Sequence, residues 1–269
     1  MQLLNKMSVV EGEIFIKELD LETIAPSTST AHLPDQGGSK TIIIGKPNTG
    51  KSTLIRSLLY SKKHIFPVAT VFSGTERENG AYAKHIPDTF IFPEYNETQV
   101  KQVLERQRLA KMHLDNPWAI LILDDCTEDP KIFNSVLQQR IMKLSRHMKL
   151  WYILSLQYAM DMKPVMRTCV DNVFILRETN LYNRKTLYEN YAGIIPTYKL
   201  FCDLMDQITN DHTALYIDNT AQTSEWQNCV FWYKASPVPE DFKFGCKDYW
   251  DFHKSRYDPD YIKNVKIDF

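Results

Sequence analysis

The chain has 269 residues, of which 43% are hydrophobic and 24% are charged, and its formal net charge is −1. This composition is typical of a soluble globular protein with a sizeable core, and it excludes a fibrous or largely disordered chain. A net charge near zero argues against a uniformly basic nucleic-acid coat, although a local basic groove stays compatible with it. The five cysteines are widely spaced and form no C-x-x-C pair. Their spacing argues against a zinc site and a disulfide framework and favours a reducing, intracellular compartment.

The first part of the chain is predicted to be an N-terminal extension over residues 1–38. It contains an apolar-alternating stretch, Gly12 to Leu21, followed by loop-forming compositions at 26–30 and at 37–38. We expect a short strand or hairpin and then a linker. We expect neither a signal peptide nor a membrane span, because the first ten residues lack a long apolar run and no stretch reaches roughly 20 apolar residues.

From Lys40 onward, short β-branched apolar runs alternate with longer amphipathic segments. This alternation predicts a doubly wound α/β domain over residues 39–235, with a mostly parallel central sheet flanked by helices. Several runs lack polar alternation, as central strands covered on both faces do. The predicted strands are 41–44, 69–72, 89–92, 118–123, 151–155, 172–176, 213–217 and 229–233, and the predicted helices begin at Lys51 and near Glu97, Pro130, Leu181 and Tyr198.

A phosphate-binding loop follows the first predicted strand of this domain. The run is Gly45-Lys46-Pro47-Asn48-Thr49-Gly50-Lys51-Ser52, and a predicted helix continues through Thr53. The glycines permit a tight turn whose N–H groups, with the helix N-terminus, point at phosphate oxygens. Lys51 would then reach the β and γ phosphates, and Ser52 would ligate Mg²⁺. A glycine turn with an incidental lysine is the alternative, and the flanking strand and helix disfavour it.

Two carboxylates end the buried apolar run of residues 119–123. They are Asp124 and Asp125, and ligands of open α/β sheets collect at such carboxyl ends of strands. Asp124 is the candidate to hold the water shell of Mg²⁺, and Asp125 is placed to orient or deprotonate the attacking water. The alternative is a strand that ends in a solvated acidic turn.

Two further polar residues flank the next apolar strand. Gln157 follows it, and its amide would donate to the γ phosphate while accepting from water. By itself, a glutamine at the end of a strand is more often a solvated rim residue. Arg146 precedes the strand in a basic helix end, which the helix dipole alone would explain. The alternative is that Arg146 is an arginine finger for the nucleotide of an adjacent subunit.

The last 34 residues, 236–269, hold few apolar runs but many aromatic side chains. We expect them to form a C-terminal tail that docks on the core or on a neighbouring molecule.

Together these features resemble the genome-packaging ATPases of large eukaryotic DNA viruses, of poxvirus, iridovirus and polinton–virophage type. Those proteins belong to the FtsK–HerA class of P-loop DNA translocases. Two carboxylates, an extra strand between the two motifs and a glutamine that ends the next strand separate the chain from GTPases, and no N-K-x-D follows the P-loop. The motifs that carry the resemblance are residues 45–52, Leu121-Ile122-Leu123-Asp124-Asp125, Ser145-Arg146-His147-Met148-Lys149, Leu154-Ser155-Leu156-Gln157-Tyr158-Ala159-Met160-Asp161 and residues 165–174.

The resemblance implies a RecA/FtsK-like fold and a motor that uses ATP and Mg²⁺ to move double-stranded DNA into a preformed capsid. It also implies a homo-oligomeric ring, a capsid or virion-membrane protein as a partner, and a place at assembly sites in the host cytoplasm. In that family Gln157 would be a sensor, Arg146 a finger acting on a neighbour, and Arg167 a second finger candidate. Asp125 stands where cellular members usually have the longer Glu, so the resemblance supports its role as catalytic base less firmly than it supports the other site residues of the two motifs. Two alternatives are a conjugative or plasmid-type DNA translocase and a nucleotide-gated scaffold with little hydrolysis.

Overall fold

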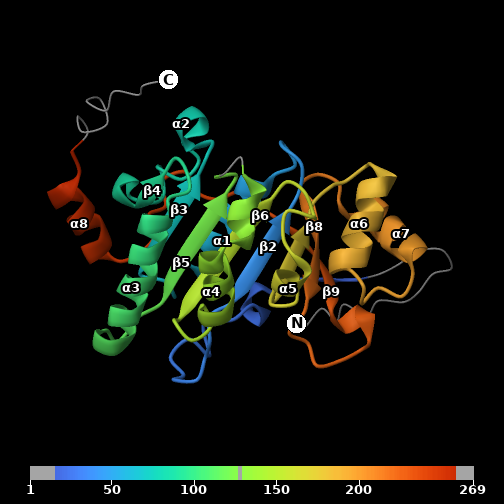
Figure 1. Cartoon of the computed structure of the whole chain (residues 1–269), viewed down its shortest axis with the longest axis horizontal. Helices are drawn as coiled ribbons and strands as arrows, with labels where there is room; N and C mark the ends of the chain where they lie inside the picture. The colour runs from blue at the N-terminus through green and yellow to red at the C-terminus, as the bar shows by residue number, and fades with distance from the viewer. Residues whose placement is uncertain (1–15, 127–128, 259–269) are drawn as a thin grey trace, which may run out of the picture.

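The predicted strands pair into one nine-stranded sheet in the computed structural model, which describes residues 16–126 and 129–258 (Figure 1). The order across the sheet is β1-β9-β8-β7-β2-β6-β5-β3-β4, and neighbours are parallel except at the β7–β8 and β8–β9 pairs. The prediction of a mostly parallel α/β sheet is therefore confirmed. The strands are β1 (Lys17–Glu18), β2 (Lys40–Ile44), β3 (Val68–Ser73), β4 (Ile91–Phe92), β5 (Ala119–Asp124), β6 (Leu150–Leu156), β7 (Asn172–Ile175), β8 (Thr213–Asp218) and β9 (Val230–Lys234).

Helices cover both faces of the sheet. Helices α3 to α7 pack on one face, and Figure 1 shows α3, α4 and α5 in front of the strands. Helix α1 packs on the other face together with residues near both ends of the described chain. The helices are α1 (Lys51–Lys62), α2 (Glu76–Asn79), α3 (Glu97–His113), α4 (Val136–Leu144), α5 (Pro164–Arg167), α6 (Leu181–Tyr191), α7 (Tyr198–Ile208) and α8 (Lys247–Arg256), with 3-10 turns at Leu21–Thr23, Asp88–Phe90, Pro130–Asn134 and Trp226–Asn228.

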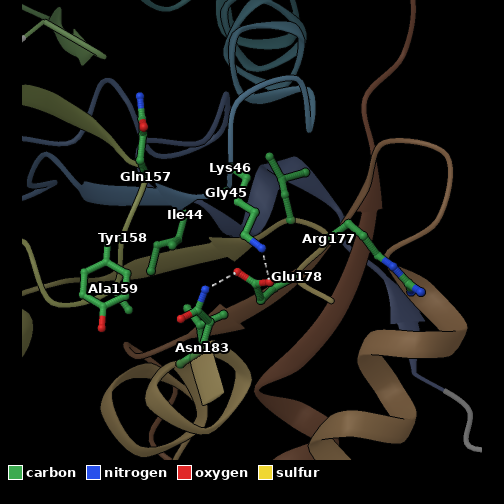
Figure 2. Close-up of a pocket in the computed structure, with 11 residues that line it drawn as sticks. Ile44, Gly45, Lys46, Gln157, Tyr158, Ala159, Arg177, Glu178 and Asn183 are labelled. Atoms are coloured by element: carbon green, nitrogen blue, oxygen red, sulfur yellow. Dashed lines mark hydrogen bonds and ion pairs between the residues drawn. The ribbon is translucent and has the colours of Figure 1, made fainter. Parts of the chain in front are cut away.

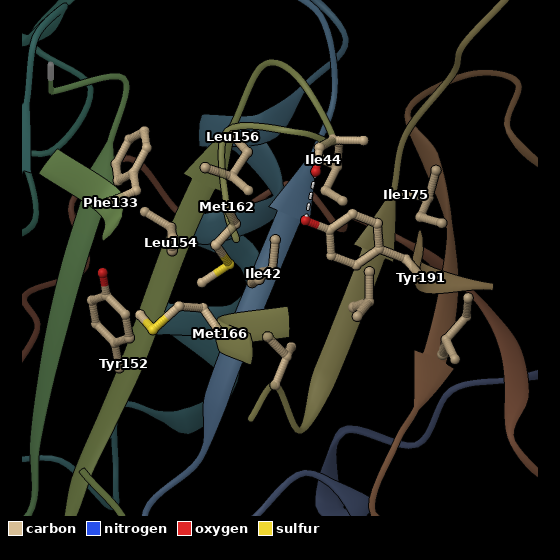
Figure 3. Packing of buried hydrophobic residues seen from close by; sticks show 14 of the residues in the cluster. Ile42, Ile44, Phe133, Tyr152, Leu154, Leu156, Met162, Met166, Ile175 and Tyr191 are labelled. Atoms are coloured by element: carbon tan, nitrogen blue, oxygen red, sulfur yellow. Dashed lines mark hydrogen bonds between the residues drawn. The ribbon is translucent and has the colours of Figure 1, made fainter. Parts of the chain in front are cut away.

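The uninterrupted apolar runs reflect this double cover. In β2, Ile42 and Ile44 enter the core on one face, whereas Ile43 enters the core on the other. Figure 3 shows Ile42 beside Met162, which follows β6, and Ile44 beside Tyr191 of α6. Complete burial of each such side chain contributes about 1.5–3 kcal/mol. A strand with polar alternation would forfeit half of that contribution, so the sequence of β2 fits only the interior of the sheet.

The order of the strands fixes the position of the motifs. Strand β2, which leads into the P-loop, pairs with β6 and β7, and β6 lies between β2 and the aspartate strand β5. Strand β6, which ends before Gln157, is therefore inserted in the sheet between the strands that carry the two motifs. Since β2, β3, β5, β6 and β7 are parallel, their carboxyl ends meet at one edge. Strand β8 is antiparallel to β7, so it begins at that same edge.

Within residues 39–235, two element boundaries differ from the sequence prediction by two residues or more. Residues 88–90 form a 3-10 turn instead of the start of a strand, and the N–H of Phe90 donates to the carbonyl of Pro87 at 2.9 Å. Only residues 91–92 pair with β3. They form β4, an edge strand whose one neighbour in the sheet is β3. The helix expected near Pro130 begins as a 3-10 turn, and α4 starts after Ser135, whose hydroxyl accepts from the N–H of Gln138.

Apart from Ile16, the buried hydrophobic side chains of both terminal segments pack on the α1 face where they are described. Strand β1 pairs with β9, and the first part of the stretch predicted as a strand or hairpin, residues 12–15, lies outside the described residues. The aromatic tail docks on the core, where the Tyr249 hydroxyl donates to the carbonyl of Ala69 at 2.5 Å and Phe244 is fully buried. Within 16–126 and 129–258, no helix has both the length and the apolar composition to cross a membrane.

Candidate active site

The P-loop joins the end of β2 to the first turn of α1. Gly50 is the N-cap of α1 with φ of +100°, and Asn48 also has a positive φ, of +63°. The turn is closed by Thr49, whose hydroxyl and N–H donate to the carbonyl of Lys46 at 2.7 and 3.3 Å. A Cβ atom at Gly50 would lie 2.8 Å from Nδ1 of His212, so both the backbone angle and the space require glycine.

Lys51 is buried inside this loop. Its ammonium donates to the carbonyl of Gly45 at 2.9 Å and lies 3.4 Å from Oδ2 of Asp125. The bound carbonyl and carboxylate oxygens are the kind of acceptors that the β and γ phosphates of a nucleotide would supply. The loop and Lys51 together are therefore suited to bind an anion.

Ser52, the residue after Lys51, contacts Asp124 at the end of β5. The Ser52 hydroxyl donates to Oδ2 of Asp124 at 2.8 Å, and the Tyr82 hydroxyl donates to the same oxygen at 2.7 Å. Burial, and then the Asp124 charge, raise the pKa of Tyr82 well above its ordinary value, so the phenol stays a donor. Among the described residues, Oδ1 of Asp124 is buried without a hydrogen-bond partner.

This donor set fits Mg²⁺. A serine hydroxyl and a carboxylate with one free oxygen are hard oxygen ligands, and Mg²⁺ in phosphate sites takes few protein ligands beside water and phosphate. The described part of the chain holds no cluster of three or more His, Cys, Asp or Glu side chains suited to a metal. Ser52 and Asp124 would thus hold the ion only together with a nucleotide.

Asp125 lines a cleft at the same edge of the sheet as the P-loop. It has a positive φ of +44°, and its Oδ1 accepts from Nε2 of Gln157 at 3.0 Å. The cleft has a volume of about 770 Å³ and lies at the carboxyl ends of β3, β5 and β6. Thr75, Tyr95 and Ser155 also line it. A water molecule in this cleft would have both an acceptor, Asp125, and an amide, Gln157, within reach.

An ion pair ties the P-loop to the segment after β7. Figure 2 shows the ammonium of Lys46 turned toward Glu178, at 2.6 Å from Oε1, whereas Arg177 points away. Burial raises the pKa of Glu178, but hydrogen bonds from Lys46, Asn180 and Asn183 outweigh it, and the net pKa is lowered. Glu178 is therefore a charged anchor for the loop.

Two predicted residues lie outside this site within a single chain. Arg146 is exposed before β6, and its carbonyl accepts from the N–H of Gly38 at 3.0 Å. The length of β6 places it about 20 Å from the P-loop edge. Arg167 ends α5, with its guanidinium 5.8 Å from the ring centroid of Tyr191. The structure thus joins Lys51, Ser52, Asp124, Asp125 and Gln157, whereas Arg146 and Arg167 contact other described residues of the chain.

Three residues of the site were not predicted from the sequence: Tyr82, Glu178 and His212. Glu178 follows an apolar strand closely, which is the signal that singled out Asp125 and Gln157. His212 directly precedes the antiparallel strand β8, and its Nδ1 lies 3.3 Å from the Thr49 carbonyl. Tyr82 lies in an irregular segment with no periodicity, so the sequence offers no signal for its contact with Asp124.

Residues 40–148 match a protein-family model described as 50S ribosome-binding GTPase. This match covers less than half of the chain and contains the P-loop and β5.

The whole chain has much closer relatives among viral proteins. Protein 088R of Invertebrate iridescent virus 3 is 50% identical over 242 residues, which are 89% of this chain and 93% of that protein. Protein 015R of Frog virus 3 is 37% identical over 262 residues, or 95% of this chain and 80% of that protein. A protein of Acanthamoeba polyphaga mimivirus is 33% identical over 230 residues, with coverages of 82% and 80%.

Solved structures with the same fold include a viral protein and a conjugation protein. B204, the DNA-packaging ATPase from Sulfolobus turreted icosahedral virus, has a TM-score of 0.55 at 17% identity, over 75% of this chain and 98% of that chain. The conjugation coupling protein TcpA has a TM-score of 0.52 at 11% identity, over 82% and 66%. The fold is that of a P-loop NTPase.

Proposed function

We propose that this chain, which belongs to the same protein family as the iridovirus and mimivirus proteins, hydrolyses ATP to move double-stranded DNA into a viral capsid. The observation that carries the proposal is the meeting of Lys51, Asp124, Asp125 and Gln157 at one edge of the sheet. The fold shared with the DNA-packaging ATPase B204 supports the part of the proposal that names DNA as the molecule that is moved.

The chemistry follows from the contacts of the site. A bound triphosphate would draw the Lys51 ammonium from the Gly45 carbonyl and the Asp125 carboxylate, because phosphate oxygens carry more negative charge. Asp125, still held by Gln157, would then accept a proton from a water that attacks the γ phosphorus, as the bond to the β-phosphate oxygen breaks. Mg²⁺ held at Ser52 and Asp124 would neutralise charge on the phosphates.

The position of β6 favours ATP over GTP as the substrate. The family model of GTPase type matches 40–148, a segment whose P-loop and aspartate strand occur in both classes. The strand inserted between β2 and β5 and the missing N-K-x-D motif separate the chain from GTPases.

The proposal includes a ring of identical subunits, with Arg146 of one subunit near the nucleotide of the next. Arg146 is exposed and lies about 20 Å from its own P-loop, so only a second molecule can bring it to a nucleotide. In this arrangement residues 39–235 form the motor core, and the terminal segments pack against that core. The fold shared with TcpA favours, as a second candidate, a DNA translocase that acts outside packaging.

The test is ATP turnover with and without linear duplex DNA, measured together with the mass of the protein in solution. We expect DNA to stimulate turnover, and the stimulation to fall as salt rises because phosphate contacts release counterions. Turnover that is unchanged by DNA at low salt would contradict the motor and favour a nucleotide-gated scaffold. Lys51→Ala protein is the control for contaminating ATPases.

A further inference from the structure

Tyr82 reaches the metal-binding carboxylate from outside both motifs. It lies between α2 and the turn at 88–90, its side chain is fully buried, and its hydroxyl donates to Oδ2 of Asp124 at 2.7 Å. The Glu76 carboxylate holds the backbone of this segment by accepting from the N–H groups of Tyr82 at 3.0 Å and Ala83 at 2.8 Å. The position of Tyr82 is thus fixed at its hydroxyl by Asp124 and at its backbone by Glu76.

The two oxygens of Asp124 have different surroundings. Oδ2 accepts from both Ser52 and Tyr82, whereas Oδ1 has no hydrogen-bond partner among the described residues, although it is buried. A buried carboxylate oxygen without a donor is costly, so such an atom usually faces a water or an ion. Because Tyr82 and Ser52 fix Oδ2, rotation of the carboxylate that would exchange the two oxygens breaks both bonds.

We propose that Tyr82 is a positioning residue for the metal: it holds Oδ2 of Asp124, so that Oδ1 stays free for the water shell of Mg²⁺. The inference rests on the Mg-nucleotide site of the proposed function. Ser52 can keep its bond to Oδ2 while its lone pair ligates the ion, since a hydroxyl both donates and accepts. Tyr82 itself touches neither the nucleotide nor the metal, and it acts through Asp124.

The test uses Tyr82→Phe, which keeps the ring in the core and removes only the hydroxyl. Tyr152→Phe is the matched control, because Tyr152 is equally buried and its hydroxyl donates at 2.7 Å to the amide oxygen of Gln138, away from Asp124. The affinity for a fluorescent, non-hydrolysable ATP analogue is measured across a Mg²⁺ titration and in EDTA. Thermal unfolding of each variant is measured in parallel.

In Tyr82→Phe, the Mg²⁺ concentration for half-maximal binding should rise about tenfold, as is typical when a partner of a metal ligand is removed. Affinity in EDTA should stay within about twofold of wild type, because the P-loop is unchanged. Tyr152→Phe should match wild type in both. An unchanged Mg²⁺ requirement in Tyr82→Phe, or an equal rise in Tyr152→Phe, would overturn the proposal, and so would an equal loss with and without Mg²⁺.

A second variant covers the case in which Tyr82→Phe unfolds at the assay temperature. Glu76→Gln leaves the phenol in place but weakens the anchor of its backbone, so the Mg²⁺ requirement should rise by a smaller factor. No rise in a folded Glu76→Gln protein would then contradict the proposal. Binding is measured without turnover or DNA, so a chain that binds Mg-nucleotide but never hydrolyses it would refute the motor and still test Tyr82.

Discussion

Lys51 and Asp125 form an ion pair across the candidate nucleotide site, with 3.4 Å between Nζ and Oδ2. One residue begins α1 and the other follows β5, so the pair joins the two motifs directly. A bound phosphate would compete with Asp125 for the same ammonium. Nucleotide binding and release of the carboxylate would therefore be coupled, and variants of the two residues should behave differently.

Replacement of Lys51 by Ala should abolish turnover. The variant removes the charge that would stabilise the β and γ phosphates, and loss of one such group lowers kcat by about 10²–10³-fold or more. Steady-state phosphate release at saturating ATP is the measurement. Hydrolysis at the wild-type rate in purified Lys51→Ala protein would sink the assignment of the P-loop as the catalytic site.

Replacement of Asp125 by Asn should separate binding from chemistry. The amide cannot accept a proton from water, so kcat should fall by roughly 10²–10⁴-fold. ATP affinity should stay equal or increase, because Lys51 no longer has a competing carboxylate. Equilibrium binding and turnover are measured on the same preparation. A kcat close to wild type would show that another group takes the proton, whereas a large loss of affinity would contradict the competition.

The sequence predicts the strands of this fold well for a physical reason. The runs in β2, β5 and β6 are apolar without interruption, and such runs are stable only between two covered faces. The residues at the ends of these strands, such as Asp125 and Gln157, follow from the parallel topology. Contacts made by irregular segments do not follow from the sequence pattern. Tyr82 donates to Asp124, which is 42 positions away, and only the tertiary fold brings the two residues together.

Glu178 should make the stability of the P-loop region depend on pH. Its pKa is lowered in the folded protein, so its contribution is present above the unfolded pKa, ordinarily near 4.5, and is lost as pH falls through the folded pKa. Glu178→Gln should lower Tm by about 2–4 °C at pH 7, equivalent to about 1 kcal/mol. The difference from wild type should shrink below pH 4.5. Scanning calorimetry from pH 3.5 to 7 is the measurement, and a difference independent of pH would contradict the charged anchor.

Gly50→Ala should weaken nucleotide binding more than it weakens the fold. The residue has φ of +100°, and the new methyl group would lie 2.8 Å from the His212 ring, so the loop must shift where phosphates bind. Left-handed backbone costs an alanine about 1–2 kcal/mol. Gly80→Ala is the control, because Gly80 also has a positive φ, of +55°, but nothing lies within 4 Å of its added Cβ. Equal affinities of the two variants for an ATP analogue would contradict a role of Gly50 in the site.

Arg146 should act on the nucleotide of a neighbouring subunit. Arg146→Ala protein keeps its P-loop but lacks the finger, and Lys51→Ala protein keeps the finger but lacks the P-loop lysine, so each alone should be inactive. In a ring of mixed subunits, about one quarter of the interfaces at a 1:1 ratio should pair an intact lysine with an intact arginine, and turnover should recover to about that fraction.

Arg140→Ala is the matched control for this mixing experiment, since Arg140 is also exposed and precedes β6 on α4. It should remain active alone, because its charge lies in the middle of α4 and interacts with Glu105 of the same chain. Arg167→Ala mixed with Lys51→Ala tests the second finger candidate in the same way. If mass measurements show mixed rings and no ratio of Arg146→Ala to Lys51→Ala restores turnover, then Arg146 does not complete a neighbouring site. Rescue by the Arg167 pair alone would move the finger to the end of α5.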